Sequence, residues 1–298
     1  MVAAAIPSEV RWSYLSFTVV FVVGLVAIFV RGDWQRARGF DKLILFGPIF
    51  YAAPLAAFAT EHFTLTKEIA SIIPRWIPWH YFWAYLVGAC FIAAAFSLVT
   101  GIQARLAASL VALTMFLFVA LMYFPSWLRH LDNRIVLTIA LRETSFSGGA
   151  LAFAASLSDD WRKRGARIVA TVARYFVTIP VLFFSYQQFR HGDYVPGVPL
   201  ERLTPTYVVG HAIWTYLAAV AYAITGAMLL IGKKTRAAAT WLGLTVLLVE
   251  LAVYVPIAVI ERASLDNGLN YLADTLMFCG AALLLARAMP REHSSGSL

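Results

Sequence analysis

Charged residues are scarce in this 298-residue chain: Asp, Glu, Lys and Arg together make up 13% of it, while hydrophobic residues make up 61%. Soluble domains are about half apolar and about a quarter charged, so this composition excludes an ordinary soluble fold. The mean hydropathy of +0.74 agrees with that exclusion. The composition therefore predicts a membrane protein.

Cysteine is almost absent, because Cys90 and Cys279 are the only two, and they form no Cys-x-x-Cys pair. We therefore expect no thiol–disulfide chemistry, and we expect both residues to be small buried hydrophobes within spans. The chain also lacks a phosphate-binding loop, a Ser-His-Asp order with a nucleophile elbow and a zinc-ligand signature. The sequence thus carries no catalytic motif, which leaves an enzymatic role undecided.

Long apolar runs are what the sequence has in abundance. A helix needs about 20 mostly apolar residues to cross the hydrocarbon core of a bilayer. The first apolar run is longer than that of a signal peptide and lacks a cleavage site, so we expect it to be a retained helix. Nine runs reach the required length: 13–30, 41–62, 80–100, 104–125, 135–157, 167–189, 207–231, 236–258 and 268–288.

Lys and Arg are unevenly distributed between the two sides of such a nine-span bundle, with fourteen on one side and eight on the other. The side richer in Lys and Arg normally faces the cytoplasm. We therefore expect the C-terminus to be cytoplasmic and the N-terminus to lie outside, in a membrane such as the bacterial inner membrane. The net charge of +8 is then an orientation signal and does not point to nucleic acid.

The sequence also repeats itself with an offset of 131 residues, since the segment from His80 to Leu86 returns as the segment from His211 to Leu217. One register that holds over a long apolar stretch indicates a duplicated unit. The same offset links further pairs: Gly101 and Gly232, Arg105 and Arg236, Pro125 and Pro256, Glu143 and Asp274, Gly149 and Gly280.

We therefore predict an all-α, polytopic transmembrane bundle of two parallel four-helix repeats plus one N-terminal helix. Four spans return the chain to its starting side, so the repeats share one orientation and a pseudo-twofold axis along the membrane normal. The predicted domains are an N-terminal helix and basic loop (1–39), repeat 1 (40–157), repeat 2 (166–290) and a polar C-terminal tail (291–298).

Landmark segments of the first repeat lie near the ends of its spans: Glu61-His62-Phe63, residues 73–79, residues 82–88, Thr100-Gly101, residues 105–108 and residues 147–151. Over residues 41–157 this pattern resembles the DoxX-like family of four-span membrane proteins. The second repeat departs from the pattern, because Gln187-Gln188-Phe189 stands where Glu61-His62-Phe63 stood.

The resemblance implies an association with redox proteins, because the family is named for its link to a quinone-linked sulfur oxidoreductase. It suggests an accessory or anchoring subunit of a membrane redox assembly, with the other subunits and the lipid bilayer as partners. The residues themselves leave open an alternative, a small-solute or proton-coupled transporter. A stand-alone membrane enzyme would need a cofactor, and the sequence carries no cofactor-binding motif.

Ionisable residues inside spans are costly, so each one is a candidate for function. One hypothesis is a polar cavity in the outer half of the bundle, open to the outside. The other is a set of interhelical ion pairs in which Arg142 neutralises Glu250 or Glu61, since Arg142 and its neighbour Glu143 point about 100° apart on a helix. The candidate cavity residues are Glu61, His62, Arg142, Glu143, Glu250 and Asp274.

Histidines supply a second set of candidates. His80 and His211 are repeat-equivalent, and Trp83 and Trp214 follow them. Two symmetric imidazoles could ligate a haem or contact a quinone, although a histidine at a span entrance is more often an interfacial residue. The pair of Glu61 and His62 could be an acid–base or quinone-contacting couple, or a hydrogen-bonded loop anchor. No tight ligand spacing points to a metal.

Overall fold

The computed structural model describes residues 6–158, 164–198 and 200–291. Most of the predicted linker between the repeats and of the C-terminal tail thus lies outside the described residues. Apart from one isolated bridge between Tyr194 and Leu203, the regular structure of the described residues is helical. The elements are α1 (Ser8–Val30), α2 (Asp33–Arg36), α3 (Asp41–Ile44), α4 (Gly47–Thr64), α5 (Thr66–Ile72), α6 (His80–Thr100), α7 (Ala104–Phe118), α8 (Phe124–Arg129), α9 (Arg134–Ser156), α10 (Arg164–Arg190), α11 (His211–Ile231), α12 (Thr235–Val249), α13 (Val255–Ile260) and α14 (Tyr271–Ala288), with π-helical segments η1 (Val119–Tyr123), η2 (Glu250–Tyr254) and η3 (Leu265–Asn270).

Eight helical segments of the described chain are long and apolar enough to cross a membrane, which makes this a multi-pass integral membrane protein. They correspond to eight of the nine predicted runs. The remaining run corresponds to α9, a helix of 23 residues. That helix is about 34 Å long, but Arg142, Glu143 and several Ser and Gly residues make it less apolar than the other eight.

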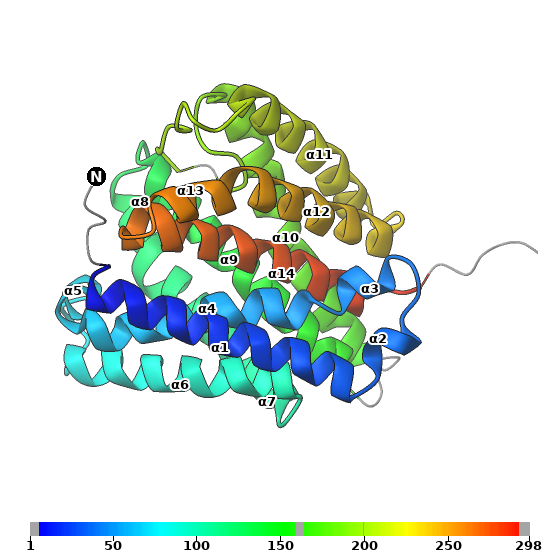
Figure 1. Ribbon diagram of the computed structural model, residues 1–298, viewed down its shortest axis with the longest axis horizontal. Coiled ribbons are helices and arrows are strands. Elements are labelled where there is room, and N and C mark those ends of the chain that lie inside the picture. Colours follow the sequence, from blue (N-terminus) through cyan, green and yellow to red (C-terminus); the bar gives the residue numbers. More distant parts are fainter. Residues whose placement is uncertain (1–5, 159–163, 199, 292–298) are drawn as a thin grey trace, which may run out of the picture.

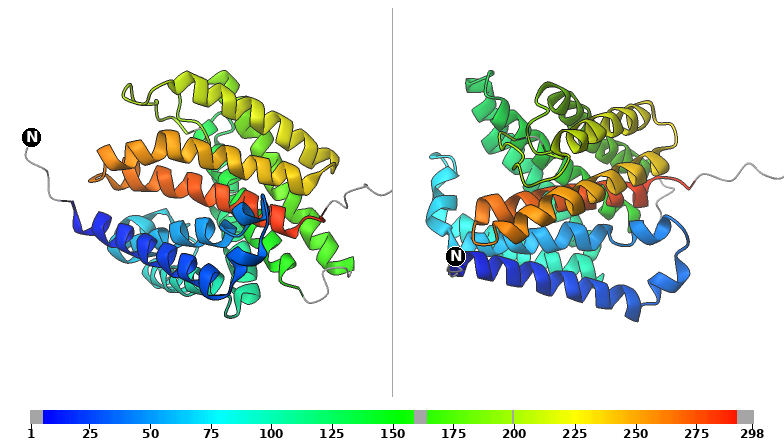
Figure 2. Two further views of the ribbon diagram at one scale, coloured as in Figure 1. Left: turned by 45° about the vertical axis from the view of Figure 1, so that its right-hand side comes forward. Right: turned by 45° about the horizontal axis from the view of Figure 1, so that its top comes forward.

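The helices α9 and α14 lie at the centre of the bundle. Helix α9 packs against α7, α10 and α14, and helix α14 packs against α4, α9 and α12. Figures 1 and 2 show α1, α4 and α6 on one side of this pair and α11 and α12 on the other. In the span that contains α14, 83% of an apolar stretch of 18 residues is buried within the protein, compared with 22% in α1. Helix α1 is therefore a peripheral helix.

Corresponding helices in the two halves have the same bounds at the 131-residue offset. The pairs are α6 and α11, α7 and α12, η1 and η2, and α8 and α13. Pro125 and Pro256 follow the two π segments. A proline lacks the backbone N–H and crowds the preceding turn, so widening that turn to a π-helix accommodates it. The packing follows the same pattern, since α9 lies on α10 as α14 lies on α4.

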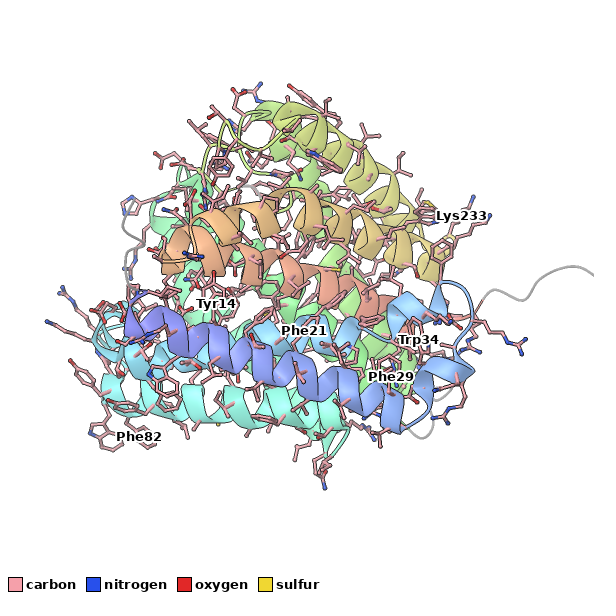
Figure 3. The ribbon with its side chains drawn as sticks, in the orientation of Figure 1. Tyr14, Phe21, Phe29, Trp34, Phe82 and Lys233 are labelled. Atoms are coloured by element: carbon pink, nitrogen blue, oxygen red, sulfur yellow. The ribbon has the colours of Figure 1, made fainter. Side chains whose placement is uncertain are left out.

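Tight turns close one end of the bundle, which we call the basic end. It comprises α2, α3, the turns after α6 and α11, and the residues after α14 (Figure 1). Gly101 and Gly232 cap α6 and α11 with φ values of 84° and 79°. Glycine adopts this left-handed conformation without the steric cost that other residues incur. Figure 3 shows Lys233 at this end and Phe82 at the opposite end.

Glycines allow the central helices to approach closely. A Cβ atom built on Gly149 would lie 2.5 Å from the Cα atom of Ala281, between α9 and α14. One built on Gly280 would lie 2.5 Å from the backbone nitrogen of Tyr51, between α14 and α4. Small residues drive helix association in lipid because they let backbones pack directly against each other.

The two cysteines have different environments. Cys279 is buried, and its thiol donates a hydrogen bond to the carbonyl oxygen of Gly243 at 3.2 Å. The expectation that both cysteines are buried is wrong for Cys90, which is exposed. Helix α6 is peripheral and buries the face that carries Ala84, Gly88 and Phe91, and Cys90 lies outside that face. The expectation failed because hydropathy does not distinguish a residue that faces lipid from one that faces protein.

The substitution Gly280→Ala should destabilise the fold by about 1–3 kcal/mol, because the added methyl group meets the backbone of α4 and cannot be accommodated by a rotamer change. The measurement is thermal unfolding of the purified protein in detergent. Gly165→Ala is the matched control, since no atom lies within 4 Å of a Cβ at that position. Equal melting temperatures for the two variants would contradict the close approach of α14 and α4.

Candidate functional site

Arg142 lies at the centre of a buried charge cluster between α9 and α14. Its guanidinium forms an ion pair with Glu143 on the same helix, with 3.0 Å between Nη2 and Oε1, and a second ion pair with Asp274 on α14. The side chains of Arg142, Glu143 and Asp274 are 14%, 10% and 11% exposed, respectively. We call these three residues the Arg142 cluster.

The structure corrects the predicted partners of Arg142. We expected Glu250 or Glu61, on the argument that Arg142 and Glu143 do not share a helix face. The arginine side chain is long enough to bend toward its neighbour while its other terminal nitrogen reaches α14. Two nitrogens of one planar guanidinium can thus engage two carboxylates. Glu143 and Asp274 are also repeat-equivalent, so a single arginine pairs with the corresponding acid of each half.

Glu61, near the end of α4, adds a third carboxyl group to this region. It lies within electrostatic range of Asp274, Arg142 and Asp266 and contacts the side chain of Asn270. Its Oε1 atom is buried and has no hydrogen-bond partner among the described residues. Tyr123, in η1, lies within electrostatic range of the whole Arg142 cluster. This region of the bundle therefore brings together three carboxyl groups, one guanidinium and a phenol.

His62 is adjacent to Glu61 in sequence but is held by a different helix. Its Nδ1 atom lies 2.9 Å from the carbonyl oxygen of Ala84 on α6, and its ring packs edge-on against Phe91. A Cβ atom on Gly88 would lie 2.7 Å from the Cβ of His62, so α4 and α6 are in close contact at this point. This geometry favours the hydrogen-bonded anchor over the acid–base couple.

Glu250 is a separate buried carboxyl group. It is 3% exposed, and neither of its carboxylate oxygens has a hydrogen-bond partner among the described residues. Its neighbours within electrostatic range are Tyr222, Tyr254 and Cys279. Of the six candidate cavity residues, the structure therefore brings together Arg142, Glu143 and Asp274, with Glu61 nearby, and leaves Glu250 and His62 apart from them.

The structure does not bring the two repeat-equivalent histidines together. Helices α6 and α11, which begin at His80 and His211, lie on opposite sides of the bundle (Figures 1 and 2). The starts of these two helices therefore lie apart, and a haem or quinone contact at either histidine stays a prediction. Trp83 is 39% exposed, whereas Trp214 packs partly against the core. In residues 6–158, 164–198 and 200–291, no group of three or more His, Cys, Asp and Glu side chains is arranged to hold a metal ion.

The pockets described in the structure lie at the basic end, away from the Arg142 cluster. The larger one has a volume of about 1060 Å³, and the smaller one lies beside it along α3 and α12. None of the six candidate cavity residues lines either pocket. The Arg142 cluster is instead part of a packed helix interface, where its charges are held by each other.

A buried loop segment was missed by the sequence analysis. Residues 195–198 are buried, although they lie in the long connection between α10 and α11. The Gln188 side chain accepts from the Gly197 N–H and donates to the Gly197 carbonyl, each at 3.4 Å, and the Tyr254 hydroxyl donates to the Pro196 carbonyl. Gln188 stands in the repeat where His62 stands in the first half. A glycine with φ of 99° between prolines was the available signal for a fixed turn.

Comparison with known proteins adds no assignment: no protein-family model matches this chain, and neither a curated protein nor a solved structure is significantly similar to it.

The substitution Arg142→Ala should destabilise the folded protein by about 3–5 kcal/mol, because it leaves two carboxylates buried without their cation. The measurement is the fraction of folded protein during denaturant titration in detergent micelles. Arg129→Ala is the control, since Arg129 is exposed and lies outside the cluster. The double variant Glu143→Gln, Asp274→Asn in the Arg142→Ala background should recover part of the loss. Failure of that rescue would show that the charge balance is not what the arginine contributes.

Proposed function

We propose that this chain is a proton-coupled membrane transporter in which the Arg142 cluster and Glu61 form the proton-binding site. In this proposal α9 is a ninth span, and the two four-helix halves are parallel repeats around an axis that passes between α9 and α14. The N-terminus lies outside and the C-terminus in the cytoplasm, as the distribution of Lys and Arg favours.

The observation that supports the proposal is a mismatch of charge. One guanidinium lies among three carboxyl groups, those of Glu143 and Asp274, which are buried, and that of Glu61, which is half-buried. If all three were ionised, the region would hold a net charge of −2 in a low-dielectric environment, which is costly. Two bound protons would make it neutral. A site that changes its number of protons between two conformations couples proton movement to that change.

The position of the site suits such coupling. Glu143 lies about 13 Å from the outer end of α9, within reach of the outer surface through few side chains. The site also lies where the two halves meet, so a relative movement of the halves would change the contact between Arg142 and Asp274. The π segments η1 and η2 are equivalent in the two halves, and π turns frequently mark functional positions in helices.

Infrared difference spectroscopy tests proton binding directly. A protonated carboxyl group gives a C=O stretching band that shifts in D₂O and is absent from the ionised form. We expect such a band in the wild-type protein and a weaker band in Glu61→Gln, which removes one of the proton-binding carboxyl groups. The control is Glu68→Gln, which alters an exposed carboxyl group near the same end. An identical band in the wild type and in Glu61→Gln would remove Glu61 from the site.

Proteoliposomes with a trapped pH-sensitive dye test the transport step. An imposed pH gradient should dissipate faster with the wild-type protein than with empty vesicles, and Asp274→Asn, which removes a proton-binding carboxyl group, should slow the dissipation toward the rate of empty vesicles. A wild-type protein that binds protons in the infrared experiment but leaves the gradient intact would retain the site and refute the transport.

A second candidate function is the accessory or anchoring subunit of a quinone-linked redox assembly that the DoxX-like resemblance suggests. The observation that favours it is a group of exposed aromatic side chains before and at the start of α6, including Trp76 at 68% exposure and Trp79 at 77%. Such residues are enriched where proteins meet partners or the membrane interface.

Native mass spectrometry of the protein gently extracted from its own membranes distinguishes the two candidates. Additional masses that match redox subunits, haem or quinone would support the accessory subunit. A monomer or homo-oligomer without them would contradict that role and leave the transporter.

A further inference from the structure

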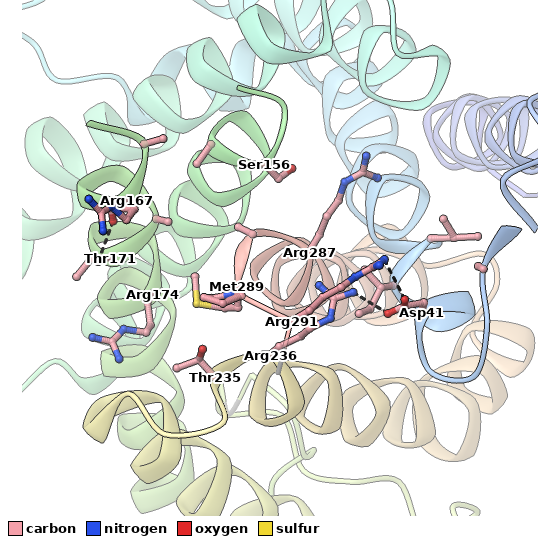
Figure 4. A pocket seen from close by; sticks show the side chains of 18 of the residues that line it. Asp41, Ser156, Arg167, Thr171, Arg174, Thr235, Arg236, Arg287, Met289 and Arg291 are labelled. Atoms are coloured by element: carbon pink, nitrogen blue, oxygen red, sulfur yellow. Dashed lines mark hydrogen bonds and ion pairs between the residues drawn. The ribbon is translucent and has the colours of Figure 1, made fainter. Parts of the chain in front are cut away.

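The larger pocket at the basic end is unusually rich in arginine. Arg36, Arg167, Arg174, Arg236, Arg287 and Arg291 line it, against only two carboxylates, Asp33 and Asp41. Its volume of about 1060 Å³ far exceeds the space that a bare inorganic ion needs. We call it the basic pocket; Figure 4 shows it from close by.

Both carboxylates of the basic pocket are already neutralised. Asp41 accepts from Arg236 at 2.6 Å and from Arg291 at 3.2 Å, as the dashed lines in Figure 4 show. Asp33 likewise pairs with Arg31 at 3.0 Å and with Arg36 at 2.7 Å. Each aspartate is thus shared by two guanidinium groups, so neither has charge to spare for the other arginines.

Arg167, Arg174 and Arg287 form no ion pair within the described part of the chain. Arg174 donates to the Leu229 carbonyl at 2.9 Å, and the guanidinium of Arg287 stacks over the ring of Phe153 at 5.2 Å. The side chain of Arg287 is exposed, and Figure 4 shows it without a hydrogen bond or ion pair to the other residues drawn. A guanidinium held on an aromatic ring keeps its N–H groups available for an anion.

We propose that the basic pocket binds the phosphate group of a phosphate ester, with Arg287 as the main ligand. Arginine is the side chain best suited to phosphate oxygens, because its N–H groups match them in pairs. The wall beside these arginines is apolar, with Ala155, Ala166, Ala170 and Met289. An ester with an organic portion fits this combination of charge, volume and apolar wall better than free phosphate does.

The location favours a membrane phospholipid as the source of that phosphate. The pocket lies where α9, α10 and α14 meet at the ends of the helices, which is the level of lipid headgroups in a bundle that spans the membrane. Basic pockets between transmembrane helices on the cytoplasmic side are suited to anionic headgroups. This inference does not rest on the proposed proton site, which lies in the other half of the bundle.

Titration of short-chain phosphatidylglycerol into the full-length protein in nonionic detergent tests the proposal, with thermal stabilisation and native mass spectrometry as readouts. Parallel titrations use phosphatidylcholine, inorganic phosphate and sodium chloride at matched ionic strength. We expect phosphatidylglycerol to bind most tightly and Arg287→Gln to weaken it by about tenfold, the value of one charge-assisted contact. Arg129→Gln, at the opposite end, should leave the affinity unchanged.

Each other outcome has a defined meaning. If inorganic phosphate stabilises the wild type as well as phosphatidylglycerol does, and Arg287→Gln removes both effects, the phosphate site is supported and its ligand is a soluble phosphate. Equal responses of the wild type and Arg287→Gln, or a wild type that binds neither compound, would overturn the proposal. If Arg287→Gln does not fold, Arg287→Lys replaces it, because lysine keeps the charge but loses the paired N–H contacts with phosphate oxygens.

Discussion

The contact between α9 and α14 is the constraint on which the rest of the bundle depends. The absence of a side chain at Gly149 allows the backbones of the two helices to meet at Ala281. Farther along α9, Arg142 links the two helices through its ion pair with Asp274 on α14. Helix α7 then packs on α9 and α12 on α14 within each half, while α10 packs on α9 and α4 on α14 across the halves. Because lipid supplies no hydrophobic drive for helices to associate, close packing and internal ion pairs have to supply it.

Charge is distributed according to the same constraint. Inside the bundle, carboxyl groups outnumber cations, and Glu61 and Glu250 retain oxygens with no hydrogen-bond partner in the described part of the chain. At the basic end the imbalance is reversed, because arginines outnumber carboxylates around a large pocket. Buried excess charge is unfavourable unless something compensates it. Protons can compensate the buried carboxyl groups of the first site, and a phosphate ester can pair with the exposed Arg287 of the second.

The sequence located the helices because crossing a membrane leaves the backbone few alternatives. Eight runs between Ser8 and Ala288 coincide with helices long and apolar enough to span, and the ninth run is the helix α9. The π-helical segments η1 and η2 begin and end at corresponding residues of the two halves. The reason is that Pro125 and Pro256, which follow them, crowd the preceding turn in the same way. The candidate acids were also visible in advance, since an ionisable residue in an apolar run is conspicuous.

Which side chains contact each other, in contrast, was decided by the tertiary structure. Periodicity gives the direction in which a side chain leaves its helix, but not which helix lies there or how far a long side chain bends. For that reason the ion-pair hypothesis named the wrong partners for Arg142, the prediction for Cys90 was wrong, and it stayed open whether His80 and His211 meet. The basic pocket escaped notice for a similar reason, because its arginines come from segments between residues 36 and 291 that only the packed bundle brings to one place.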